Sequence, residues 1–309
     1  MALTLKEHSA SRTHVTGVVL MAKSTRFVLV EGESDARFLS PRLAGRARAT
    51  PIDGGRAAVQ EAHSFLENHG ASNYVALVDA DFNEVLGLNE SLPRMVYVSI
   101  SADTADSTID LESTLLRTRA LRQLCGQHLG NHIQDLGGPA VFTNTIREAL
   151  RAAAAAVGAY RAAVMSFFAD RKAIQGIGEV TDSEWERFVD LETGAIDASQ
   201  LEEMIKTRVQ NTIKYPQVKA LARDCSLNAG HGWLLCRGHD MTQLLALRLS
   251  HISGRRIDQR TIEDKLLASF KGNLFTDTTF GQQLIAFCCP SHAAATPPMT
   301  PPVPRGRFR

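Results

Sequence analysis

Six acidic side chains lie where short apolar runs end or soon after them: Glu31, Asp35, Asp79, Asp81, Asp110 and Glu112. The apolar runs at 26–30, 74–78 and 95–100 are rich in β-branched residues and predict buried strands. In an open parallel sheet, polar groups that follow the strands collect at one edge, where ligands bind. These carboxylates are therefore expected to share one rim, which would be costly without a cation.

Carboxylate oxygens are the ligands that Mg²⁺ and Mn²⁺ prefer. Two such ions about 3.5–4 Å apart can activate a water and stabilise a leaving oxygen, as in phosphodiester hydrolysis. Glu31, Asp79 and Asp81 are the expected catalytic carboxylates, and all six acids are candidate metal ligands. Asp110 has an alternative interpretation, because the sequence Asp-Leu-Glu could open a helix with Asp110 as its N-cap.

A second candidate motif, Arg237-Gly238-His239-Asp240, follows the apolar run 233–236 and precedes a predicted helix. A strand, a tight turn and a helix are expected between 233 and 252. A cation in this motif could bind or polarise a phosphate. His239 is thus a candidate catalytic residue, with a structural histidine and an Asp240 N-cap as the alternative. Candidate phosphate-binding side chains are Arg237, Arg255 and Arg256.

Strands that alternate with single helices predict an α/β fold with a parallel sheet covered on both faces. This catalytic core is expected at 26–115. A mainly helical domain is expected at 116–289, where the alanine-rich stretch 145–170 has high helix propensity. The segment 1–25 precedes the core, and its apolar part 15–22 is expected to form a strand or turn. The proline-rich tail 290–309 is expected to be disordered.

Two motifs, VLVEGESD at 28–35 and ALVDADFN at 76–83, together resemble the toprim fold. The Glu31-to-Asp35 spacing is similar to that of the overcoming-lysogenization-defect (OLD) nuclease group. With PIDGG, DLES and CRGHD, the motifs from Val28 to Leu249 resemble a toprim family that includes the effector nuclease of the PARIS anti-phage system. The resemblance implies a Mg²⁺-dependent endonuclease, tRNA as the favoured substrate and an ABC-type ATPase partner. It also implies that Glu31, Asp79 and Asp81 hold metal, supported by Asp35 and Glu112.

The composition is that of an ordinary globular protein. The 309 residues carry 34 Lys+Arg against 33 Asp+Glu, so attraction to nucleic acid must come from local patches. No apolar run is long enough for a membrane span, and five cysteines without a CxxC motif favour a reducing cytoplasm.

A homodimer is a further expectation for this chain. The competing hypotheses are an interaction module without catalysis, a DNA-acting OLD-like nuclease and, last, a primase-like or topoisomerase-like enzyme.

Overall fold

The computed structural model describes most of the chain, and the chain divides into two compact units. The first comprises 1–80, 90–101 and 272–304, and the second comprises 81–89, 102–271 and 305–309. The described residues are 5–83, 85–86, 92–98, 108–167, 177–209, 214–228, 232–270 and 275–289. The predicted proline-rich tail lies outside them.

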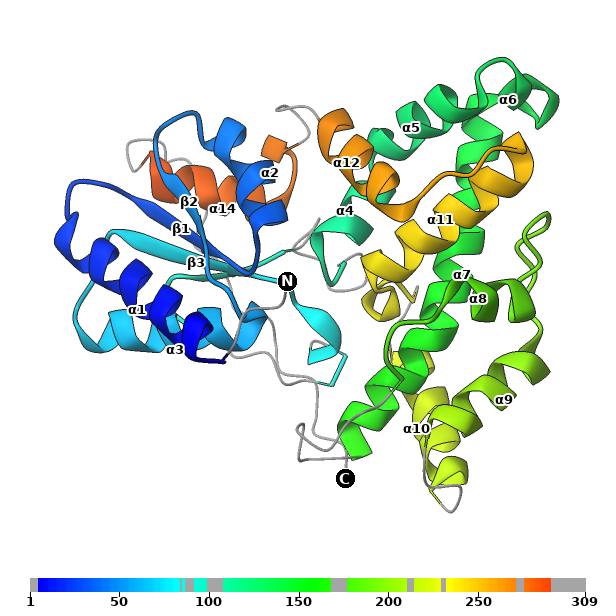
Figure 1. Cartoon of the computed structure of the whole chain (residues 1–309), viewed down its shortest axis with the longest axis horizontal. Helices are drawn as coiled ribbons and strands as arrows, with labels where there is room; N and C mark the ends of the chain where they lie inside the picture. Colours follow the sequence, from blue (N-terminus) through cyan, green and yellow to red (C-terminus); the bar gives the residue numbers. More distant parts are fainter. Residues whose placement is uncertain are drawn as a thin grey trace. The chain divides into compact units, whose positions relative to one another are not determined.

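A four-stranded parallel sheet with helices is the centre of the first unit, in a Rossmann-like arrangement (Figure 1). The strand order is β2-β1-β3-β4. Phe27 of β1 pairs with Arg48 of β2 and with Tyr74 of β3. The elements are α1 (Leu5–Met21), β1 (Phe27–Val30), α2 (Glu33–Leu43), β2 (Arg48–Pro51), α3 (Gly55–Asn68), β3 (Tyr74–Val78), β4 (Met95–Tyr97) and α14 (Thr279–Cys288). The predicted parallel α/β sheet is confirmed.

Helices cover both faces of the sheet, and its two central strands are therefore fully buried. On one face, α1 and α3 place Val19, Val59 and Leu66 in the same apolar core as Leu29 and Ala76. Figure 1 shows α2 and α14 over the opposite face. The ring of Phe38 in α2 meets that of Phe275, just before α14, edge to face. The parallel pairing of β1 with β3 within this core brings their carboxyl ends to the same edge.

The amino-terminal segment and the edge of the first unit differ from the sequence prediction. The apolar stretch 15–22, expected to be a strand or turn, belongs largely to α1, which packs against α3. The helix α14 returns to the first unit from the far end of the chain, although the prediction placed it in the helical part. Local periodicity carries no information about such a return.

The second unit is helical in the parts that the structure describes, apart from a two-residue bridge. Its long central helix α7 contacts α5, α10, α11 and a short 3₁₀ helix (Figure 1). The elements are η1 (Asp81–Asn83), α4 (Leu111–Arg117), α5 (Arg119–Leu129), α6 (His132–Asp135), α7 (Gly138–Phe167), α8 (Asp182–Phe188), α9 (Ala198–Arg208), α10 (Tyr215–Asn228), η4 (Trp233–Leu235), α11 (Gly238–Ser253) and α12 (Gln259–Ser269).

One expectation for this unit is wrong: residues 233–236 do not form a strand. Trp233–Leu235 form the 3₁₀ helix η4, which packs against α7 at Gly158. A Cβ atom at Gly158 would lie 2.8 Å from the carbonyl carbon of Leu235 and closer still to its oxygen, so only glycine permits this approach. Within the described ranges, no helix is both long and apolar enough to cross a bilayer.

Candidate functional site

Glu31 and Asp79 meet at the carboxyl edge of the sheet. Glu31 follows β1 and Asp79 follows the neighbouring parallel strand β3. The Asp79 backbone N–H donates to Oε1 of Glu31 at 2.8 Å. The structure thus brings together two of the predicted catalytic residues, for the topological reason that the sequence suggested.

Arg56 fixes the backbone that carries Asp79. Its Nη1 donates to the carbonyl oxygens of Asp79 at 3.0 Å and Ala80 at 2.8 Å. Its guanidinium also lies over the ring of Tyr97, 5.5 Å from the centroid. Sequence reasoning missed this bracing role. The Gly54-Gly55 sequence just before Arg56 was the signal for a tight turn that directs this side chain, since both glycines have positive φ.

Asp35 lies near the same edge in the first turn of α2. Its Oδ2 accepts the Gly32 N–H at 3.1 Å, closing the start of the helix just after Glu31. Negative charge is favourable at a helix N-terminus. Asp35 therefore orders the turn that carries Glu31, and its implied role as a supporting metal ligand stays a prediction.

The remaining acids belong to the second unit. Asp81 has φ 49°, a conformation that aspartate tolerates, and its N–H donates to the Ile109 carbonyl at 3.1 Å. Asp110 is buried and is the N-cap of α4, as its alternative interpretation predicted. Its two carboxylate oxygens accept the Ser113 N–H at 2.9 Å and the Gly238 N–H at 2.6 Å. Glu112 is partly buried in the first turn of α4.

Burial raises the pKa of Asp110, and the charge of Asp81 adds to the rise, while hydrogen bonds from Ser113 and Gly238 oppose it. A ligand to Mg²⁺ must be deprotonated. Asp110 thus has the features of a brace that ties α4 to the start of α11. Both side-chain oxygens of Asp110 are committed to backbone donors.

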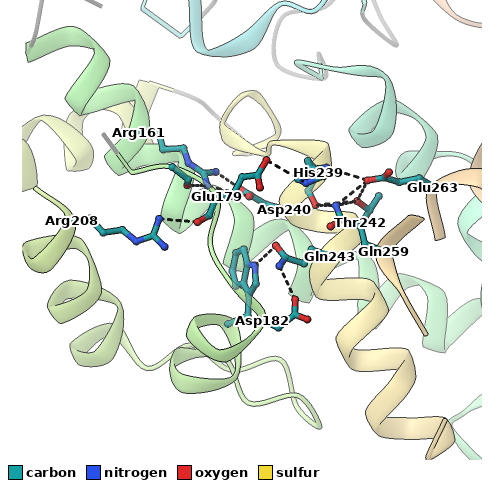
Figure 2. A network of polar contacts seen from close by, with 12 residues as sticks. Arg161, Glu179, Asp182, Arg208, His239, Asp240, Thr242, Gln243, Gln259 and Glu263 are labelled. Carbon is teal, nitrogen blue, oxygen red and sulfur yellow. Dashed lines mark hydrogen bonds and ion pairs between the residues drawn. The ribbon is translucent and has the colours of Figure 1, made fainter. Parts of the chain in front are cut away.

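The motif 237–240 starts α11 directly, and Arg237 rather than Asp240 is the N-cap residue. The Asp240 N-cap prediction is wrong. Asp240 is buried and forms an ion pair with the buried guanidinium of Arg161 in α7. Arg161 also donates to the carbonyl oxygens of Ile177 at 2.9 Å and Gly178 at 2.7 Å (Figure 2). This pair fixes α11 against α7 and against the segment before α8.

His239 lies next to this pair with its side chain 41% exposed. Its Nδ1 is 3.2 Å from Oε1 of Glu263, and its Nε2 is 3.8 Å from Oε1 of Glu179 (Figure 2). The hydrogen bond to Glu263 raises the pKa of His239, against partial burial, which lowers it. Burial alone would raise the pKa of Glu263, but hydrogen bonds from His239 and Thr242 hold it below its ordinary value. Sequence reasoning missed Glu263.

The predicted phosphate-binding arginines lie at the ends of α11. Arg237 is partly buried at its start. Arg255 and Arg256 are exposed in the loop that follows Gly254, at its end. The structure therefore does not gather the three guanidinium groups at one end of this helix.

The donor set at the sheet edge suits a hard divalent cation, because Glu31 and Asp79 supply only oxygen. Gly55 borders the Glu31 carboxylate, since a Cβ atom there would lie 3.8 Å from Oε2, an ordinary van der Waals distance. Across the described ranges, however, no three His, Cys, Asp or Glu side chains form a ready metal-binding group. Glu31 and Asp79 fit a metal as a pair that needs further ligands from water or substrate.

Comparisons with protein-family models, with curated proteins and with solved structures find no significant match to this chain. The fold and the site therefore define only a broad class. It is an α/β protein with a parallel sheet and an acidic carboxyl edge, joined to a helical unit with its own polar network.

Proposed function

We propose that the chain is a Mg²⁺-dependent endonuclease of toprim type, with Mn²⁺ as a substitute ion. The observation that carries the proposal is the contact between Glu31 and the Asp79 backbone at the carboxyl ends of two adjacent parallel strands. Ala80 alone separates Asp79 from Asp81 in the chain. A metal held by Glu31, Asp79 and Asp81 would activate water and stabilise the leaving oxygen, with a second ion completing the arrangement.

The residues at the sheet edge have separate tasks in this proposal. The Asp79 N–H orients the Glu31 carboxylate, which accepts the proton of the attacking water. Arg56 holds the Asp79 and Ala80 carbonyls and so fixes the direction of the neighbouring carboxylates. Asp35 keeps the turn after β1 closed. Removing Arg56 should therefore weaken metal binding without removing a ligand.

The substrate and the partner follow from the motif resemblance. That resemblance supports RNA, with tRNA favoured, and a role as the toxic effector of an anti-phage defence system. It also supports an ABC-type ATPase as the partner that holds or activates the nuclease, in the cytoplasm. The helical unit is the proposed surface for that partner or for a homodimer.

A non-catalytic interaction module is the second candidate. Its support is that Asp35 and Asp110 use their carboxylates to bind backbone N–H groups, as structural acids do. In that account Glu31 likewise only secures the Asp79 loop. A DNA-acting OLD-like nuclease and a primase-like enzyme rank below both.

The deciding experiment compares wild type, Glu31→Gln and Glu33→Gln in bacteria, with and without the candidate ATPase. Glu33 is the matched control because it is an exposed acid two residues away in α2. Growth is measured while new 5′ and 3′ ends are mapped in tRNA, mRNA and chromosomal DNA. We expect wild type and Glu33→Gln to create new tRNA ends and Glu31→Gln to create none. Equal partner binding by all three proteins without any cleavage would support the interaction module.

A further inference from the structure

The helices α5 and α12 of the second unit pack against each other (Figure 1), and a cavity opens between them. Its volume is about 530 Å³, which is in the range of small-molecule sites. Residues spaced three and four apart lie on one face of a helix, and each helix turns such a face to the cavity. The lining residues are Gln123, Gly126, Gln127, Lys265, Ala268 and Ser269.

Among the described lining residues, Lys265 is the charged one. Its Nζ lies 3.0 Å from Nε2 of His128. Partial burial lowers the pKa of His128, and the charge of Lys265 lowers it further. The imidazole is therefore neutral at pH 7 and can accept a hydrogen bond from the ammonium group. His128 thus orients Lys265 without neutralising its charge.

The carboxylates of α12 are engaged elsewhere. Glu263 lies 3.2 Å from Nδ1 of His239, on the side of α11. Asp264 lies 4.0 Å from Nε of Arg260. The sequence of α5 contains no acidic residue. In the part of the chain that the structure describes, the cavity wall therefore has a positive charge and no negative one, which favours an anionic ligand.

Gly126 keeps space open on the α5 side of the cavity. Glycine in the middle of a helix is less stable than alanine. Close packing does not require it here, because a Cβ atom at Gly126 would meet no described atom within 4 Å. Since Gly126 also lines the cavity, a larger side chain at this position would fill the cavity without a clash inside the helical unit.

We propose that this cavity binds a nucleoside monophosphate, with the phosphate on Lys265 and the base edge on the carboxamides of Gln123 and Gln127. One ammonium group matches one phosphate group. A glutamine carboxamide offers both a donor and an acceptor, as the edge of adenine does. The volume of about 530 Å³ leaves space for a nucleoside beside the phosphate. This site goes beyond the proposed nuclease activity and does not depend on it.

Isothermal titration calorimetry of the full-length protein tests the site with AMP, inorganic phosphate and adenosine. EDTA is present, so that no metal-bound nucleotide at the sheet edge contributes. We expect wild type to bind AMP more tightly than either fragment. Lys265→Met should weaken AMP binding roughly 10–100-fold because charge-assisted hydrogen bonds are lost, and Lys265→Arg should restore part of the affinity. Gly126→Leu should abolish binding by filling the cavity.

The matched control is Arg260→Gln, which removes an exposed cation of the same helix and should bind AMP as wild type does. Urea denaturation verifies that each variant is folded. Absence of AMP binding by wild type, or unchanged binding in Lys265→Met or Gly126→Leu, would overturn the inference. Inorganic phosphate that binds as tightly as AMP would also overturn it, because the base would then not be recognised.

Two further measurements separate this site from an RNA contact and from the nuclease. If tRNA binding is lost in Lys265→Met and Gly126→Leu while AMP does not bind to wild type, the cavity contacts an RNA backbone and the nucleotide proposal is wrong. Glu31→Gln should bind AMP as wild type does. Loss of the nuclease and loss of the nucleotide site are therefore distinguishable.

Discussion

Replacing Gly158 by alanine tests the packing that places the 237–240 motif. Alanine would ordinarily stabilise a helix by about 1 kcal/mol relative to glycine. At Gly158 the new methyl group would lie 2.8 Å from the Leu235 carbonyl carbon and closer to its oxygen. Overpacking costs about 1–3 kcal/mol and more when backbone must move. We therefore expect a net loss of about 2 kcal/mol or more in the free energy of unfolding.

The matched control is Gly126→Ala in α5, where a Cβ atom would meet nothing within 4 Å. This variant should gain up to about 1 kcal/mol. Both are measured by urea denaturation followed by circular dichroism and by tryptophan fluorescence, because Trp233 lies in η4. If Gly158→Ala is as stable as wild type, or if both variants lose stability equally, the close approach of η4 to α7 is wrong.

Three further predictions concern the polar groups. Asp240→Ala should cost about 3–5 kcal/mol of unfolding free energy because it leaves Arg161 charged and buried, and a double variant with Arg161→Met should recover part of that loss in the same denaturation assay. Arg56→Ala should weaken Mn²⁺ binding about 10–100-fold by calorimetry, with partial rescue by Arg56→Lys; equal affinities would contradict the bracing role. Glu263→Gln should destabilise more at about pH 6 than at about pH 9. The raised pKa of His239 contributes stability below its unfolded value of about 6.5 and loses it as pH rises through the folded value. A pH-independent loss in urea denaturation would refute this assignment.

The parallel sheet and the Glu31–Asp79 contact follow from local patterns. Buried β-branched runs that alternate with helices leave little choice of topology, and adjacent parallel strands end at the same edge. The N-cap role of Asp110 could also be predicted from the sequence, because an aspartate directly before the apolar start of a helix is typical of an N-cap. The cap depends on residues close together in sequence, and the contact between Glu31 and Asp79, 48 residues apart, follows from the strand order that the alternation of strands and helices predicts.

The features that sequence reasoning missed depend on distant partners. The run 233–236 looks like a strand, but Trp233–Leu235 form a 3₁₀ helix that packs against the distant Gly158, and nothing within the run reveals this. In the sequence, Asp240 looks like a helix N-cap. Its actual partner, Arg161, lies 79 residues away in the chain, so the sequence does not reveal the ion pair. Glu263 is one of many acids on predicted helices. Only the fold shows that it meets His239.

The most direct test of the central claim is Mg²⁺-dependent cleavage by purified full-length protein. Wild type, Glu31→Gln and the control Glu33→Gln are incubated with end-labelled tRNA, with and without Mg²⁺, after their equal stability has been verified. The account predicts Mg²⁺-dependent fragments from wild type and Glu33→Gln and at least a 100-fold slower reaction from Glu31→Gln, a loss in the range of about 10²–10⁴ for an essential acid–base group. Cleavage at the same rate by Glu31→Gln, or none by any of the three, would contradict it.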